Sequence, residues 1–396
     1  MNASIRELCD LTVSALQNKP YVHSFSHPET LFMTARENGL SGLVYRGIPA
    51  GSLDEANQKK FKADWLRYQA KDIAQRAAVE ELDIACEEAG LDHLYLKGVL
   101  VKDCYPEPYM RSMGDIDVLF RSEDMEKVHE MFEKMLGYQH HADSEAHDIF
   151  LKDRDLIVEA HRSIDVESNE ERWLLFADPW KHANQEKGHR YVFEPEYFLM
   201  HLLRHLAKHL LSSGIGLRSV LDIGLYLEKN IERLYDKKLD EMLKMTNLEL
   251  FFGNILVLNQ ILFELDSMPE WSKQGNADPE FIDELVGYIS SSGIHGTAQG
   301  FNPQAVGMTK IAMKQGTARR GRLTYLFRVV FPSRKVLRQQ YPYLKKCAFL
   351  LPIAWIQRWW KKLFRQSKRT MHLIRNLNVT NNTIKSHATL FSKLGL

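Results

Sequence analysis

The chain has few cysteines, no long apolar run and, in its last quarter, no acidic residue. Its four cysteines (Cys9, Cys86, Cys104 and Cys347) lack the spacing of a zinc or redox motif, and such usage is typical of the reducing cytoplasm. The longest apolar run, from residue 347 to 356, is ten residues long and contains a proline, so it is too short to cross a bilayer. The N-terminal residues lack the apolar segment of a secretory signal. We therefore expect a cytoplasmic protein.

The missing acidic residues leave the two parts of the chain with opposite charge. Residues 301–396 carry 20 Lys and Arg and no Asp or Glu, whereas the first 300 residues carry 32 basic and 51 acidic side chains. A basic segment of this kind binds an anionic partner or docks on the acidic part of its own chain. Residues 353–364 interleave three Trp with Lys and Arg, which is typical of a helix on a membrane surface or of a nucleic-acid contact. We expect docking or peripheral membrane contact rather than nucleic-acid binding.

Helical and strand-like patterns alternate, and they predict an α+β fold. A long helix is expected from Asp54 to Gly90, then a short strand at Leu94–Leu96, a helical stretch that two prolines stop, an Asp-Ile-Asp strand and a helix that ends near Gly137. We predict four parts, which are an N-terminal helical region (1–90), an α/β core with a small mixed sheet (91–165), a helical domain (166–295) and a basic C-terminal extension (296–396).

Further elements are predicted after residue 140. Two strand-like runs, His147–Lys152 and Leu156–His161, are separated by Asp153-Arg154-Asp155, which predicts a hairpin turn. After Trp173 the pattern is helical again. The clearest helices are expected at Glu196–Leu211 and Leu217–Lys229, because their apolar residues recur every three or four positions.

The segment 114–120 places two carboxylates two residues apart at the start of an apolar run. If the run is a β-strand, Asp115 and Asp117 point to one face while Ile116 and Val118 point into a core. Neighbouring carboxylates repel each other unless a cation offsets their charge. Mg²⁺ is the natural cation, since it takes carboxylate oxygens and keeps positions for phosphates. The pair therefore predicts phosphate chemistry.

Other residues could complete a site for nucleotidyl transfer, which needs metals, a third carboxylate and a turn that holds a triphosphate. Glu159 lies on an apolar strand and could face the Asp pair across the sheet, or pair with a nearby cation. Gly98 lies between a strand and a helix, where a tight turn lets backbone N–H groups approach a phosphate. Lys97 and Arg111 are cations that could neutralise phosphate charge, although Arg111 could instead pair with a neighbouring acid.

Histidines form a stripe on one predicted helix. His201, His205 and His209 recur every four residues, but no HExxH glutamate or nearby cysteine accompanies them. The stripe predicts a helix face packed on the core or, alternatively, a row of polar groups bordering the active-site cleft. Asp222 fits the same helix interface. His161 is expected to support the site or the core rather than to bind metal.

These segments resemble a known family. Leu96-Lys97-Gly98, Arg111, Gly114-Asp115-Ile116-Asp117-Val118 and Val158-Glu159-Ala160-His161 are similar to the uncharacterised nucleotidyltransferase family of the DNA polymerase β-like superfamily. The resemblance covers roughly residues 30–230. It implies that Asp115 and Asp117 bind metals, that Glu159 is the third acid and that Gly98 contacts the triphosphate. The chain departs from the superfamily at the first turn, where Lys97-Gly98 replaces the usual Gly-Gly or Gly-Ser.

The residues and the resemblance together predict a metal-dependent enzyme. It would use Mg²⁺ or Mn²⁺ to transfer an NMP from an NTP such as ATP to an acceptor hydroxyl, with release of pyrophosphate. Relatives often occur among polysaccharide-biosynthesis functions, so the resemblance implies a setting in surface-polysaccharide biosynthesis, while the acceptor stays open between a sugar, a lipid, a protein and a small molecule. Two alternatives stay open, namely a glycosyltransferase whose Asp-X-Asp holds a metal and a nucleotide-sugar, and a non-catalytic scaffold that docks on a membrane through its basic extension.

Overall fold

The computed structural model describes residues 1–153, 156–164, 171–266, 269, 272, 275–293, 301–338, 340–364 and 376–396. Arg154 and Asp155 of the predicted hairpin turn lie outside these residues. So do the predicted domain boundaries near residues 165 and 295, and the four-part division stays a prediction.

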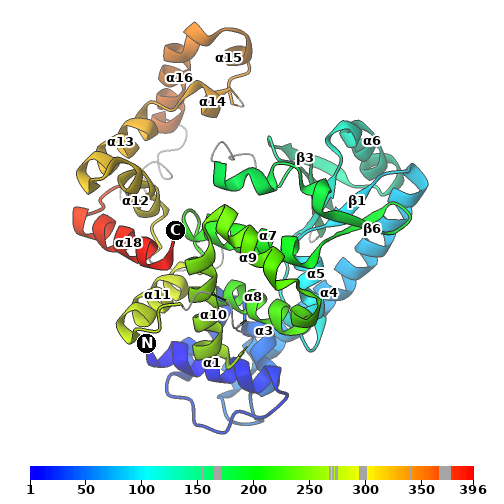
Figure 1. The fold of residues 1–396 in the computed structure, drawn as a ribbon, viewed down its shortest axis with the longest axis vertical. Helices are drawn as coiled ribbons and strands as arrows, with labels where there is room; N and C mark the ends of the chain where they lie inside the picture. The colour runs from blue at the N-terminus through cyan, green and yellow to red at the C-terminus, as the bar shows by residue number, and fades with distance from the viewer. Residues whose placement is uncertain are drawn as a thin grey trace.

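Helices surround a seven-stranded mixed sheet, which confirms the predicted α+β fold (Figure 1). The strands are β1 (His93–Tyr95), β2 (Ile116–Phe120), β3 (Gln139–Asp143), β4 (His147–Lys152), β5 (Leu156–His161), β6 (Ala183–Lys187) and β7 (Arg190–Phe193). The described helices are α1 (Ala3–Leu16), α2 (Pro28–Glu37), α3 (Ser41–Val44), α4 (Glu55–Ala89), α5 (Gly98–Val101), α6 (Met125–Glu130), α7 (Pro195–Leu210), α8 (Leu217–Asn230), α9 (Asp236–Thr246), α10 (Glu249–Phe263), α11 (Pro279–Ser292), α12 (Pro303–Gln315), α13 (Ala318–Val330), α14 (Arg334–Leu337), α15 (Tyr343–Lys346), α16 (Leu351–Phe364) and α18 (Asn381–Leu394). Short 3₁₀ stretches lie at Tyr45–Gly47, Lys102–Cys104, Pro108–Met110, Ser122–Asp124, Glu171–Phe176, Pro179–His182, Ile231–Arg233 and Ala348–Leu350, and a π-turn follows α6 at Met131–Met135.

The strand order is β3-β4-β5-β2-β1-β7-β6, so β2 lies at the centre of the sheet. It pairs with β1 in the antiparallel and with β5 in the parallel sense. The bounds of β4 and β5 are those that the sequence predicts, and the two strands pair as an antiparallel hairpin. Hydrogen-bonded strands on both sides fix the position of every residue of β2.

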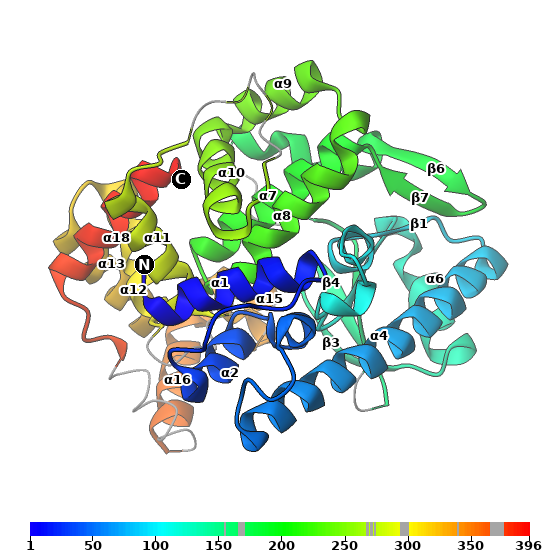
Figure 2. The ribbon, with the colours of Figure 1, turned by 90° about the horizontal axis from the view of Figure 1, so that it is seen from below.

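The two faces of the sheet belong to different cores. Ile116, Val118 and Phe120 of β2 pack in a core with α4 and α6. Leu94 and Leu119 point to the other face and join a larger core with the N-terminal helices and with α7, α8 and α10. Figure 2 shows α4 as a long rod along the first face. The second face is therefore the one on which α7 and α8 can contribute to a site.

Local signals set the ends of the main helices as predicted. Helix α4 starts after Asp54, whose side chain accepts a hydrogen bond from the backbone N–H of Asn57. It ends at Gly90, whose left-handed φ of 65° is favourable for glycine. Helices α7 and α8 agree with the predicted ranges to within one residue at each end.

The helical pattern predicted after Trp173 is wrong for residues 183–193, which form the β6–β7 hairpin. Gly188, with φ of 54°, lies in the turn between the strands. Strand β7 pairs in parallel with β1 through Arg190 and His93, and it thereby extends the central sheet. Pairing with a strand almost 100 residues earlier in the chain decides the local structure here, because strand preference depends strongly on such partners.

The C-terminal helices extend away from the body. Figure 1 shows α12, α13 and α18 side by side, with α14, α15 and α16 beyond them at the end of the molecule. Within the described residues no single helix is long and apolar enough to cross a membrane. Helices α9 and α10 would meet that test only as a pair, and they are bent by 117° relative to each other.

Candidate active site

Strands β2 and β5 bring the predicted carboxylates together on the second face of the sheet. Asp117 of β2 lies directly opposite Glu159 of β5 in the parallel register. Asp115 precedes β2 by one residue, and by the alternation of the strand it lies on the same side. The structure thus places Asp115, Asp117 and Glu159 around one pocket, which all three line.

Two cationic or protonatable side chains contact Asp117, which is 5% exposed. The Lys97 Nζ donates to Asp117 Oδ1 at 2.7 Å, and His161 Nε2 lies 2.8 Å from the same oxygen. His161 Nε2 is also 3.4 Å from Glu159 Oε2, which in turn lies 3.7 Å from His147 Nε2. His161 therefore connects two of the three carboxylates.

Burial and neighbouring charges shift the pKa values of the clustered side chains. Burial raises the pKa of Asp115 to about 6, and the charges of Asp117 and Glu159 add to the rise. Burial also opposes ionisation of Asp117, but Lys97 and His161 outweigh it and hold the pKa of that carboxyl well below its usual range. For His161, hydrogen bonds to Asp117 and Glu159 outweigh burial and raise the pKa. Asp115 is thus the carboxylate with the greatest need of a further cation.

In the turn after β1 the residue with a strained backbone conformation is Lys97 and not Gly98. Lys97 has φ of 46° and ψ of −107°, a conformation that costs a non-glycine residue on the order of 1–3 kcal/mol. Gly98 is needed for close packing instead, because a Cβ there would lie 2.4 Å from Met113 Sδ and 2.8 Å from an Arg111 nitrogen. The strained turn points Lys97 at Asp117.

Arg111 has a carboxylate partner far along the chain. Its Nε and one terminal nitrogen each donate to Asp222 of α8 at 2.9 Å, in a bidentate pair that is buried on both sides. Tyr105 donates to the same carboxylate at 2.8 Å. Asp222 of α8 therefore holds the segment between Tyr105 and Arg111, and Arg111 forms part of the pocket wall.

The loop that leads into β2 is held from both neighbouring helices. From α4, Lys71 Nζ donates to the Gly114 carbonyl oxygen at 3.0 Å, and Gln75 Nε2 donates to that of Met113 at 3.1 Å. From α8, Arg218 donates to both the carbonyl and the hydroxyl of Ser112. These residues position Asp115, and spacing in the sequence does not indicate them.

The pocket has a volume of about 840 Å³ and is rich in cations. Four carboxylates line it, against nine Lys and Arg side chains. The cations not yet described as part of the wall are Arg36, Arg67, Lys102, Arg204 and Lys208. A cavity with this balance of charge suits a polyphosphate.

The histidine stripe of α7 borders this pocket, which is the second of the two readings that the sequence allows. His201, His205 and His209 all line it. Burial lowers the pKa of His201 to about 3, so it is neutral near pH 7, and its Nε2 is buried without a hydrogen-bond partner. His209 Nδ1 lies 2.6 Å from the hydroxyl of Ser213. Burial lowers the pKa of His205 as well, so His201 and His205 contribute neutral polar groups to the wall.

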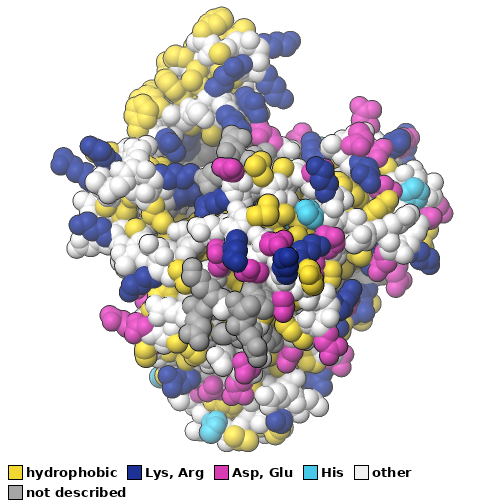
Figure 3. Space-filling model, viewed as in Figure 1, with side chains coloured by type: hydrophobic (Ala, Val, Ile, Leu, Met, Phe, Trp, Pro, Cys, Tyr) yellow, Lys and Arg dark blue, Asp and Glu magenta, His cyan; other side chains and the backbone are white. Residues whose placement is uncertain are grey.

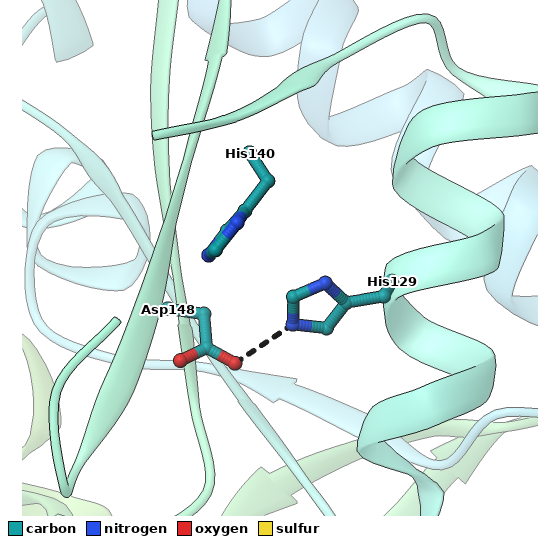
Figure 4. A group of neighbouring side chains, drawn as sticks. All are labelled: His129, His140 and Asp148. Atoms are coloured by element: carbon teal, nitrogen blue, oxygen red, sulfur yellow. Dashed lines mark hydrogen bonds and ion pairs between the residues drawn. The ribbon is translucent and has the colours of Figure 1, made fainter. Parts of the chain in front are cut away.

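Two groups of side chains among the described residues could hold a metal ion. One is His147, Glu159 and His161, beside Asp117. The other is His129, His140 and Asp148, in which only His129 and Asp148 are joined by a hydrogen bond (Figure 4). Asp148 lies opposite Ala160, on the core face of the sheet away from the pocket.

Arg162 already donates to the same Asp148 oxygen as His129. A cation therefore offsets the charge of that carboxylate. Only the group at Glu159 lies among further carboxylates and beside a pocket, and it is the better candidate for a metal centre.

A mixed sheet with three carboxylates under a cation-rich pocket is an arrangement suited to phosphoryl chemistry. Comparison with protein families identifies the class, because the family described as uncharacterised nucleotidyltransferase matches residues 26–264. The match covers more than half of the chain, and the chain belongs to this family. A search of curated proteins and a search of solved structures each find no match. The family assignment supports a general nucleotidyltransferase function.

Proposed function

We propose that the chain transfers an NMP from an NTP to an acceptor hydroxyl in a metal-dependent reaction and releases pyrophosphate. The observation that carries the proposal is the convergence of Asp115, Asp117 and Glu159 on one pocket that nine Lys and Arg side chains also line. Paired carboxylates with a third acid are the donor set of nucleotidyl transfer, and the cations match the charge of a triphosphate.

The residues present fit a divalent metal. The pKa of Asp115 is raised by burial and by the two neighbouring carboxylates, which is the condition that a bound cation relieves. Asp115 and Asp117 would hold the metal, with Glu159 as third ligand or base. Bound Mg²⁺ or Mn²⁺ supplies charge neutralisation for the phosphates and for the attacking oxygen. The nearby histidine nitrogens favour Mn²⁺ over Mg²⁺ as the metal.

The other side chains have roles in moving a proton and in balancing charge. Glu159, with His161 against it, would accept the proton of the acceptor hydroxyl as its oxygen bonds to the α-phosphorus. The bond from that phosphorus to the β-phosphate oxygen breaks, and pyrophosphate leaves. Lys97 would offset the charge that develops on the leaving group, whereas Arg111, whose charge is paired with Asp222, would hold the pocket wall in place. Gly98 would let the backbone of the turn approach the triphosphate.

The test is label transfer from each NTP in turn. Purified protein is incubated with an α-labelled NTP, Mg²⁺ or Mn²⁺ and a cell extract, and both product label and pyrophosphate are measured. We expect one NTP to give labelled product, and Asp115→Ala/Asp117→Ala to give none. Asp143→Asn, an exposed carboxylate of β3, is the matched control and should keep full activity.

The proposed acceptor is a hydroxyl of a sugar precursor. The resemblance points to surface-polysaccharide biosynthesis, so hydroxyls of sugar precursors are the first acceptors to test. Absence of product and pyrophosphate under every condition would contradict the proposal. Transfer of labelled sugar from a nucleotide-sugar to the acceptor would favour the glycosyltransferase alternative. A folded protein that transfers neither group would favour the non-catalytic scaffold.

A further inference from the structure

The C-terminal arm, defined here as residues 318–364 from α13 to α16, has an unusual surface. It contains twelve Lys and Arg and no Asp or Glu. It also holds nine of the 21 exposed large hydrophobic side chains among the described residues. Figure 3 shows hydrophobic side chains gathered on this projecting part of the molecule, with Lys and Arg beside them. Exposed apolar side chains among many cations are typical of a surface that binds a partner.

Helix α16 is held on α13 by its polar and aromatic groups. Trp355 Nε1 donates to the carbonyl oxygen of Pro332 at 2.8 Å, and Trp359 Nε1 donates to that of Val330 at the same distance. Arg358 donates to the carbonyl of Val329 at 2.9 Å. These bonds fix which face of α16 turns inward.

The outward face of α16 is an apolar stripe. Phe349, just before the helix, is 80% exposed, and Ile353, Ile356, Trp360 and Phe364 follow at spacings of three or four residues with exposures of 48%, 60%, 66% and 66%. Residues at this spacing lie on one side of a helix. In a helix that packs on a protein core, such a stripe would face inward. Here the hydrogen-bonded side faces inward and the apolar stripe faces solvent.

Helix α13 adds a second exposed apolar row beside it. Leu323, Phe327 and Val330 also follow a spacing of three or four residues, and they are exposed by 58%, 63% and 44%. Lys345 and Lys346 of α15 and Lys361 of α16 are exposed as well. The arm thus presents two apolar rows and exposed cations.

We propose that this face docks on an anionic lipid bilayer, with the apolar rows at the interface and the cations at the headgroups. Helix α16 has 14 residues and, at about 1.5 Å each, is too short to span the hydrocarbon core. Its basic, Trp-bearing composition suits a helix that lies in the interface. Pairing of two arms would bring cations against cations, and a nucleic acid would leave the apolar rows in water.

The arm is attached next to the pocket. Lys335 and Arg338 pair with Glu145, at the turn between β3 and β4. The next two residues, Ala146 and His147, line the pocket. Docking would therefore bring the pocket close to the membrane. The proposal uses no residue assigned to the reaction, so it can fail while the proposed function stands.

The test is sedimentation of the full chain with vesicles, without nucleotide or metal. Vesicles of phosphatidylcholine with one-quarter phosphatidylglycerol are compared with vesicles of phosphatidylcholine alone, at low and high salt. The stripe variant is Phe349→Ser/Ile353→Ser/Ile356→Ser/Trp360→Ser. Its matched control is Ile73→Ser/Ile84→Ser on α4, where the side chains are 69% and 62% exposed. Circular dichroism shows that each variant is folded.

We expect the wild type and the control to bind the anionic vesicles, more weakly at high salt, and to bind neutral vesicles little. The stripe variant should bind about tenfold less tightly or worse. The proposal is overturned if the wild type does not bind anionic vesicles, or if the stripe variant binds them as tightly as the wild type does. Stripe-dependent dimers, or RNA binding, in a wild type that does not bind vesicles would also overturn it.

Discussion

Replacing Asp115 by Asn should stabilise the metal-free protein. Raising the pKa of this carboxyl from 3.8 to about 6 makes its ionised form unfavourable in the fold by about 3 kcal/mol. A raised carboxyl pKa means that the folded state binds the proton more tightly, so stability is lost as pH rises from about 4 to 6 and stays lost above. Asn has nearly the same shape and removes that charge at every pH.

The predicted gain therefore depends on pH in a defined way. At about pH 7.5 the Asn variant should be more stable than the wild type by about 3 kcal/mol, and at about pH 5 by only about 1.5 kcal/mol. The assay is urea unfolding in the presence of a chelator. Asp143→Asn, in an exposed position, should stay within about 0.5 kcal/mol of the wild type.

Bound metal should make the wild type more stable than the Asp115→Asn variant, which reverses the order expected without metal. Bound metal stabilises the folded wild type by mass action, and the variant has lost one ligand, so saturating Mn²⁺ should stabilise the wild type more. A chelated Asn variant that is less stable than the wild type at both pH values would refute the account of Asp115 as an uncompensated carboxylate. A gain with no dependence on pH would refute it equally.

Three further predictions follow from the contacts of the site. Lys97→Gly removes both the cation on Asp117 and a strained backbone position. Calorimetry should therefore show about tenfold tighter Mn²⁺ binding to the variant than to the wild type. An unchanged Mn²⁺ affinity would contradict the role of Lys97 as the cation that offsets Asp117. Mn²⁺ should bind the wild type more tightly than Mg²⁺, and His147→Gln, which removes the histidine beside Glu159, should reduce that preference in the same titration. Arg111→Ala leaves the buried Asp222 charge unpaired and should cost about 3–5 kcal/mol in urea unfolding, whereas a loss below about 1 kcal/mol would contradict a buried pair.

Local signals were enough for the elements that carry the carboxylates. Alternating apolar residues predicted β4 and β5 with their bounds, and Asp54 and Gly90 marked the ends of α4. The expectation that Glu159 faces the Asp pair agrees with its register opposite Asp117. These features depend on residues that are close together in the sequence or on one face of a strand.

The remaining features depend on contacts between distant segments. The pairing of Arg111 with Asp222 joins residues 111 positions apart, and the β6–β7 hairpin forms against a much earlier strand. The role of His147 beside Glu159 depends on the register of β4 and β5. No local pattern distinguishes such residues from others of the same type, so the sequence alone does not indicate them.

The most direct test of the central claim follows the two ends of the triphosphate separately. The protein, Mn²⁺ and the acceptor that gives product are incubated with an NTP labelled at either the α- or the γ-phosphorus. We predict that the α-label stays with the acceptor, that the γ-label leaves as pyrophosphate, and that Asp117→Asn abolishes both. Transfer of the γ-label to the acceptor, its release as free phosphate, or equal rates in the Asp117→Asn variant would contradict nucleotidyl transfer at this site.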